Sequence, residues 1–152
     1  MIYTLYFLRS SEQKIAKDMS VIAYNKELSE LEIYYKNYGL TPSDIGLYAL
    51  VENEIAGGAW VRLIDKKATL SIAVKPKFQG SKVGSQMLNQ LFLELGGVYK
   101  TLHVELNEDD KKSIFFEKFG FVRQDKLTLV KQIKNEQVLR PTDGYDPSRW
   151  IE

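Results

Sequence analysis

One segment near the middle of the chain joins a β-type run to a helical pattern through a proline and two glycines. Residues 68–75 (ATLSIAVK) have the composition of a strand, and Pro76 ends the pairing because proline has no N–H to donate to a sheet ladder. Gly80 and Gly84 follow, and without a Cβ they let the backbone approach a bulky ligand closely. Apolar residues then recur four apart up to Leu95. The sequence therefore predicts a strand and a helix joined by a loop whose glycines leave the main chain accessible.

The start of such a helix is suited to phosphate. Its first N–H groups have no partner inside the helix, and that end carries about half a unit of positive charge. A pyrophosphate fits this arrangement, and Lys77 and Lys82 would add point charges. The same two glycines also permit a tight strand-to-helix turn that binds nothing, so the residues alone leave both interpretations open.

The remaining pattern predicts a mixed fold. Ser10 and Gln13 have the spacing of a capping box ahead of a helix that carries Ile15, Met19 and Ile22, and Asn53-Glu54 has the composition of a tight hairpin. Hairpin-connected strands around one strand–helix–strand unit indicate an α+β domain. Strands are expected over 2–8, 46–52, 55–64, 68–75, 100–106, 121–125 and 127–133, and further helices over 27–38, 84–95 and 109–119.

The chain has the size and composition of a single domain. Its 152 residues are 44% apolar and 27% charged, which are ordinary globular values. No repeat, low-complexity tract or linker divides it, so residues 1–134 are expected to form one domain. Residues 135–152 contain two prolines and few core residues except Trp150. They are expected to form a tail that docks on the domain or on a second subunit.

Composition also excludes several classes of site. With 21 basic and 20 acidic side chains, the chain lacks the basic excess of duplex-binding proteins, so no nucleic-acid partner is expected. The absence of cysteine excludes disulfides and thiolate metal sites, and a single histidine, His103, excludes a histidine-rich metal site. The apolar run at the N-terminus is too short for a membrane span and lacks the flanks of a signal peptide. A cytoplasmic protein without metal or membrane partner is expected.

Three motifs in a fixed order resemble the GNAT superfamily of acetyl-CoA-dependent N-acetyltransferases. Residues 74–88 (VKPKFQGSKVGSQML) resemble its acetyl-CoA loop, whose core pattern is Gln/Arg-x-x-Gly-x-Gly/Ala. Residues 115–121 (FFEKFGF) resemble the second signature, and the strand 102–105 precedes it as in the family. Residues 46–62 resemble the hairpin ahead of the loop. Order and spacing agree over roughly residues 2–134, which identifies the chain as a member of this superfamily with a mixed, mostly antiparallel twisted sheet of six to seven strands flanked by about four helices.

The resemblance implies direct transfer of an acetyl group from acetyl-CoA, the co-substrate, to a primary amine of a small molecule or peptide. The backbone N–H groups of Gln79 to Gly84 would bind the pyrophosphate, and the pantetheine arm would pair with the backbone at Ile72 and Val74, where neighbouring strands splay apart. A homodimer is a further expectation from the family. The implied co-substrate residues are Ile72, Ala73, Val74, Gln79, Gly80, Ser81, Lys82, Val83, Gly84, Ser85 and Phe116.

The chain departs from the family pattern at two positions. Lys82 replaces the middle glycine of the loop, which is compatible only if that residue needs no positive φ. Phe116 stands where many members place a tyrosine proposed to protonate the leaving thiolate, and phenylalanine has no proton to give. Such acid catalysis is worth about 10²- to 10⁴-fold. Ser113, one helical turn earlier, or water would have to serve instead.

Two further interpretations stay open at this level. Glu105 is the candidate base for the attacking amine, but Glu105 and His103 also fit the polar face of a half-buried strand. Tyr34, Tyr35, Tyr38 and Trp60 would line an acceptor pocket or simply pack in the core.

The departures at Lys82 and Phe116 also favour an alternative function, a weakly active or inactive acyl-CoA-binding sensor or interaction module. The dinucleotide-binding alternative is weaker because the loop lacks G-x-G-x-x-G.

Overall fold

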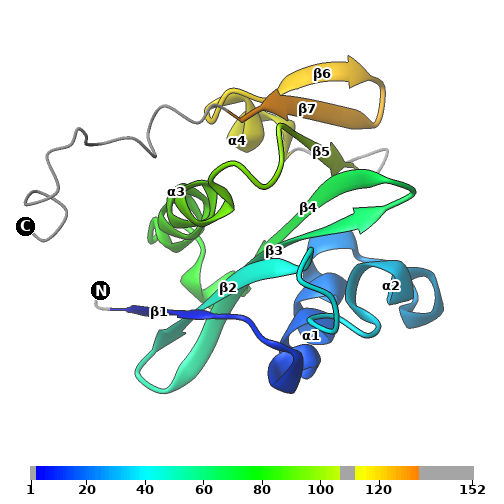
Figure 1. Cartoon of the computed structure of the whole chain (residues 1–152). Coiled ribbons are helices and arrows are strands. Elements are labelled where there is room, and N and C mark those ends of the chain that lie inside the picture. The colour runs from blue at the N-terminus through cyan, green and yellow to red at the C-terminus, as the bar shows by residue number, and fades with distance from the viewer. Residues whose placement is uncertain (1–2, 107–111, 134–152) are drawn as a thin grey trace, which may run out of the picture.

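The computed structural model describes residues 3–106 and 112–133. Their strands form one seven-stranded sheet with the order β1-β2-β3-β4-β5-β7-β6, in which only β4 and β5 are parallel neighbours (Figure 1). The prediction of a mixed, mostly antiparallel sheet is confirmed. The strands are β1 (Thr4–Phe7), β2 (Ile45–Val51), β3 (Glu54–Ile64), β4 (Lys67–Val74), β5 (Thr101–Glu105), β6 (Val122–Asp125) and β7 (Thr128–Gln132).

Helices cover both faces of this sheet. The helices α1 (Gln13–Tyr24) and α2 (Leu28–Tyr35) lie on one face, and α3 (Val83–Leu95) lies on the other (Figure 1). The short helix α4 (Ser113–Glu117) adds Phe116 to the core on the α3 side. Among the described residues, no helix is long and apolar enough to cross a membrane.

The alternation of side chains along β4 divides the core into two clusters. Leu70 and Ile72 point toward α3 and join its buried leucines, whereas Ser71 and Ala73 point toward α1 because successive strand residues face opposite sides. The α3 side is built almost entirely of aliphatic and phenylalanine side chains. The α1–α2 side instead contains tyrosines and Trp60. The two faces of one strand therefore meet chemically different layers.

Some local predictions differ from the structure. The β2–β3 hairpin turns at Glu52-Asn53, one residue earlier than expected, and both residues have positive φ (51° and 69°) as a tight two-residue turn requires. The predicted Ser10–Gln13 capping box does not cap α1, because residues 10–12 form a 3₁₀ turn. Glu12 is the N-cap residue of α1 but makes no side-chain hydrogen bond to that helix; its carboxylate accepts the Arg9 N–H at 3.0 Å and so caps the 3₁₀ turn. The helix α2 ends at Tyr35 because Lys36 is extended (ψ 130°). The predicted tail 135–152 and the first residues of the predicted helix 109–119 lie outside the described residues.

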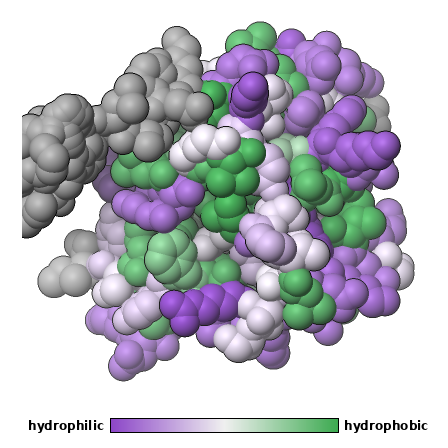
Figure 2. Space-filling view, viewed as in Figure 1, coloured by the Kyte–Doolittle hydropathy of each residue, from purple (hydrophilic) through white to green (hydrophobic). Residues whose placement is uncertain are grey.

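Apolar side chains also reach the surface on the α3 side of the molecule. Leu93 on α3 and Val98 just after it are 55% and 57% exposed. Figure 2 shows apolar groups in the middle of the face that is turned to the viewer in Figure 1, with polar groups around them. The expected homodimer stays a prediction.

Candidate functional site

The parallel strands β4 and β5 separate soon after they meet. Their pairing is confined to Thr69 opposite His103. The Lys75 N–H donates to Ala56 O on β3 at 2.8 Å, so the main-chain groups of alternate residues, Ile72 and Val74 among them, face the opposite edge. Among the described residues, no strand pairs with that edge beyond Thr69. An open strand edge therefore lies where the sequence predicts contact with an extended arm.

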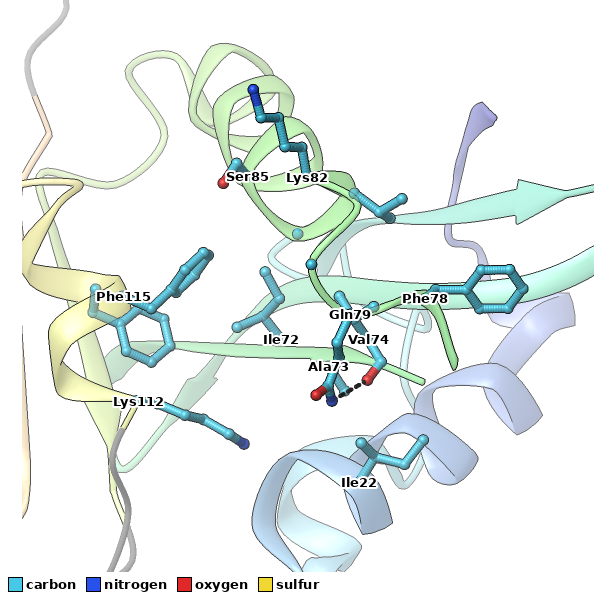
Figure 3. A pocket seen from close by; sticks show the side chains of 14 residues that line it. Ile22, Ile72, Ala73, Val74, Phe78, Gln79, Lys82, Ser85, Lys112 and Phe115 are labelled. Carbon is cyan, nitrogen blue, oxygen red and sulfur yellow. Dashed lines mark hydrogen bonds between the residues drawn. The ribbon is translucent and has the colours of Figure 1, made fainter. Parts of the chain in front are cut away.

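A cavity of about 470 Å³ occupies the space that this separation opens (Figure 3). Its wall consists of β4, the loop that follows, the start of α3, and side chains from α1 and α4. Every predicted co-substrate residue except Ser81 lines the cavity, and the Ser81 hydroxyl donates instead to Phe78 O. Four lining residues were not predicted from the sequence: Ile22, Phe78, Lys112 and Phe115.

The loop presents main-chain donors at the start of α3. The first bond of this helix runs from the Gln86 N–H to Lys82 O (3.0 Å), and no side chain caps the helix. The N–H groups of residues 83–85 precede that bond, so they are the unpaired donors of a helix start. The Gln79 N–H, also predicted as a donor, already bonds to Pro76 O at 3.3 Å. The donor set therefore lies nearer to the helix than the sequence suggested.

The side chain of Gln79 secures the exit from β4. Its Nε2 donates to Val74 O at 3.0 Å, which holds the loop against the end of the strand (Figure 3). Phe78, 5% exposed, anchors the 3₁₀ turn Pro76–Phe78 in the core beside it. The loop is thus held at its start by one hydrogen bond and one buried ring, while its backbone stays at the cavity rim.

Two loop residues have left-handed backbone. Gly80 has φ +83°, and a Cβ built there would meet no atom within 4 Å, so the glycine leaves open space at the cavity. Lys82 has φ +71°, although a lysine in this conformation costs about 1–2 kcal/mol. The sequence made a lysine at this position compatible with the family's loop only if the residue needs no positive φ. The structure shows a positive φ, so that condition does not hold. Lys82 carries strain that a glycine would avoid.

The charges around the larger cavity suit an anion. Among the described residues, Lys82 and Lys112 line it and no aspartate or glutamate does. Lys77, predicted as a second cation for phosphate, instead donates to Glu54 Oε1 at 2.7 Å and lies outside the lining. This hydrogen bond lowers the pKa of Glu54 below its ordinary value. Of the two lysines indicated by the sequence, Lys82 therefore lines the cavity and Lys77 does not, and Lys112 is the further lysine in the lining.

A second, much smaller hollow of about 10 Å³ lies on the β5 side. Glu105 lines it, and its Oε1 accepts a hydrogen bond of 2.6 Å from the Tyr34 hydroxyl. The Tyr24 ring stacks on Tyr34 with 3.9 Å between centroids, and the Tyr24 hydroxyl is 2.7 Å from Ser71 Oγ. Glu105, although exposed, is therefore hydrogen-bonded to a buried tyrosine.

The Tyr34 hydroxyl keeps its proton in this environment. Burial is the largest cause, and the hydrogen bond to Glu105 adds to it; together they raise the pKa of Tyr34 well above its ordinary value. Tyr34 thus keeps the proton that it donates to Glu105 at neutral and mildly alkaline pH. One end of the carboxylate is fixed, so its orientation relative to the hollow is defined.

Of the other candidate residues, Phe116 lines both cavities, and Ser113, Tyr38 and Trp60 line neither. Ser113 begins α4 and lines neither cavity. Phe116 is buried (3% exposed) with its ring against Phe121. Tyr38 and Trp60 are wholly buried and bond to Leu8 O and Tyr34 O, which assigns them to the core.

His103 lies on the same face of β5 as Glu105, two residues earlier, but lines neither cavity. Its buried Nδ1 has no partner among the described residues. Tyr24 was missed because nothing local distinguishes it from a core tyrosine. Its partner Ser71 is 47 residues away.

Comparison with known proteins agrees with this geometry. Residues 43–123 match the family model of the acetyltransferase (GNAT) domain. A comparison with curated protein sequences gave no match. The matched segment spans more than half of the chain, so the chain belongs to the GNAT acetyltransferase family.

Solved structures show the same fold at low sequence identity. The ribosomal-protein-S18-alanine N-acetyltransferase of Escherichia coli is 20% identical, with a TM-score of 0.66 over 88% of this chain and 95% of that one. A GNAT acetyltransferase of Brucella melitensis in complex with acetyl-CoA is 14% identical, with a TM-score of 0.65 over 88% and 89%. An N-acetyltransferase of Staphylococcus aureus Mu50 is 14% identical, with a TM-score of 0.63 over 88% of this chain and 100% of that one.

Proposed function

We propose that this protein is an N-acetyltransferase that transfers an acetyl group from acetyl-CoA to a primary amine by direct attack in a ternary complex. The observation that carries the proposal is the cavity of about 470 Å³ between the open edge of β4 and the uncapped start of α3. The family supports acetyl transfer, and the Brucella melitensis relative was solved with acetyl-CoA. Acetyl-CoA supplies the activated thioester.

The residues present fit this co-substrate. A pyrophosphate needs main-chain donors and a positive potential, and the N–H groups of residues 83–85 lie beside Lys82 at the helix start. A pantetheine arm carries amide groups that can pair with a strand edge, which β4 offers at Ile72 and Val74. The bare Gly80 leaves room for the bulk of the ligand. Each part of the wall therefore corresponds to one part of the ligand.

Glu105 is the proposed base. As the amine nitrogen bonds to the acetyl carbon and the carbon–sulfur bond breaks, the Glu105 carboxylate would accept the proton that the nitrogen loses. Tyr34 would hold the carboxylate in place through its 2.6 Å hydrogen bond. The larger contribution comes from holding both reactants at the junction of the two cavities, since such positioning supplies about 7–11 kcal/mol of barrier reduction.

The acceptor is proposed as a primary amine of a small molecule or a peptide. The Escherichia coli relative acts on an alanine of ribosomal protein S18, which makes a peptide N-terminus one member of the panel to test. The carboxylate of Glu105 at the hollow suits an amine that arrives as a cation.

A non-catalytic acyl-CoA-binding module is the second candidate. Phe116 offers no proton to the leaving thiolate, and Ser113, the side chain predicted to substitute for the family tyrosine, lines neither cavity. This observation concerns only the chemical step. It leaves the binding of acetyl-CoA unaffected.

Two measurements on the same protein separate the candidates. Isothermal titration calorimetry with acetyl-CoA tests binding, and release of the CoA thiol over a panel of small amines, lysine peptides and peptide N-termini tests transfer. We expect binding and at least one productive acceptor. Binding without release for any amine would favour the module, and absence of binding would refute both.

A further inference from the structure

The two cavities meet at a junction with a distinct composition. Of the described residues, three line both cavities: Ile72, Lys112 and Phe116. If the larger cavity holds the donor and the smaller one, which has room for about one water-sized group, receives only the attacking nitrogen, the reacting atoms must meet beside these three side chains. Two of the three are apolar. Lys112 is therefore the shared residue that brings charge to the place of reaction.

The ammonium group of Lys112 is held in a defined position. Its Nζ donates to Ala23 O at 2.6 Å, near the C-terminal end of α1, where the helix favours a cation. Figure 3 shows this side chain extending from the α4 side across the cavity toward α1. The Lys112 carbonyl accepts the Phe116 N–H at 3.1 Å, so the lysine lies one helical turn before the phenylalanine that replaces the expected proton donor.

We infer that Lys112 stabilises the thiolate of the departing CoA by its positive charge, in place of a proton donor at position 116. The inference rests on the proposed function. When the carbon–sulfur bond breaks, its electron pair stays on sulfur, and the ammonium keeps its own proton while it balances the new negative charge. Water supplies the proton to sulfur afterwards. A thiol with a pKa near 8.5 makes such a leaving group feasible.

The other ionisable groups at the cavities do not fill this role. Among the described lining residues they are Lys82, Glu105 and Tyr24. Lys82 lies at the start of α3, on the far side of the cavity from Lys112 (Figure 3). A Glu105 carboxylate would repel a thiolate, and Tyr24 lines only the smaller cavity. Of the described residues, Lys112 is the cation that lines both cavities.

The test compares the affinity of CoA with that of desulfo-CoA, which lacks the thiol, by calorimetry between pH 7 and pH 9. If Lys112 lowers the pKa of the bound thiol by about one unit, the affinity of CoA relative to desulfo-CoA rises about sixfold over this range in the wild-type protein. Lys112→Arg should keep the rise because it keeps the charge. Lys112→Met should abolish it, and Lys118→Met, on the exposed end of the same helix, should not.

The outcomes distinguish the inference from the proposed function. If wild-type protein binds neither ligand, both fail. If both ligands bind but the relative affinity still rises in Lys112→Met, the inference alone is refuted. If Lys112→Met weakens both ligands equally and lowers the melting temperature, Lys112 is a structural tie between α4 and α1, and the inference is likewise refuted.

Discussion

The two walls of the site are built in opposite ways. The donor wall, as we name the wall proposed for acetyl-CoA, consists of β4, the loop 76–82 and the start of α3, is continuous in sequence, and offers the open edge of β4 and the unpaired N–H groups of residues 83–85. The acceptor wall, as we name the wall proposed for the amine, contains Tyr24 and Glu105 at the smaller cavity and their hydrogen-bond partners Ser71 and Tyr34 behind them, which come from four elements.

This difference determines which changes each wall can tolerate. A backbone surface depends on φ angles and on the absence of a Cβ, so replacement of one polar side chain by another alters it little. A wall of hydrogen-bonded side chains depends on each donor and acceptor, because a removed partner leaves a buried polar group unsatisfied. The donor wall should therefore respond to substitutions of glycine, and the acceptor wall to the loss of a single functional group.

The largest effect should follow a change of one atom in the acceptor wall. Glu105→Gln still accepts the Tyr34 hydrogen bond but cannot take a proton, so turnover should fall about 10²- to 10⁴-fold with little change in acetyl-CoA affinity. Steady-state kinetics across pH with the best acceptor would show this, with Glu117→Gln on the exposed side of α4 as control. An unchanged pH–rate profile would exclude Glu105 as the base.

A methyl group added to the donor wall should weaken binding without affecting the base. Gly80 and Gly96 both have positive φ and room for a Cβ, but only Gly80 lines the cavity. Alanine at Gly80 should cost about 1–2 kcal/mol of folding stability, and alanine at Gly96 at least as much, because its φ of 49° and ψ of −121° lie outside the left-handed helical region. We expect only Gly80→Ala to weaken acetyl-CoA binding, by about tenfold in calorimetry. Equal affinities in the two variants would mean that the ligand does not approach Gly80.

The hydroxyl of Tyr34 should affect how the unfolding free energy depends on pH in the alkaline range. Its raised pKa means that the unfolded chain loses this proton near pH 10 while the folded protein keeps it. The unfolding free energy should therefore fall above pH 10, by at most about 1.4 kcal/mol per pH unit for this group. Urea unfolding from pH 8 to 11 should show a shallower decline for Tyr34→Phe, with the exposed Tyr6→Phe as control. A decline equal to that of the wild type would contradict the buried, hydrogen-bonded hydroxyl.

The smallest expected effect concerns Lys82, where two substitutions separate the contribution of the backbone conformation from that of the side-chain charge. Lys82→Gly should raise the unfolding free energy by about 1 kcal/mol because it relieves the left-handed φ, whereas Lys82→Ala keeps that strain. Both variants lose the ammonium, so both should bind acetyl-CoA a few-fold more weakly if it contacts phosphate. Unchanged or tighter binding in both would show that the charge makes no contact.

The donor wall was predictable because its cause is local. Pro76 ends the strand, Gly80 supplies the left-handed turn, and the helical spacing begins at once, so adjacent residues carry the whole argument. The conformation of Lys82 was not predictable, since lysine is normally excluded from positive φ and only the surrounding turn imposes it. The hairpin at Glu52-Asn53 differed by one residue for a similar reason: the register of the paired strands fixes it.

By itself, the sequence determined the order of strands and helices, the α+β class and the segment that forms the loop beside the larger cavity, because hydrophobic period, proline and glycine act over a few residues. Only the tertiary structure decided that Tyr34 and Glu105, 71 residues apart, share a hydrogen bond. It also placed Lys112 against α1, 89 residues from Ala23. Such contacts arise when the sheet brings distant side chains to one edge, and no local pattern specifies which polar groups will meet there.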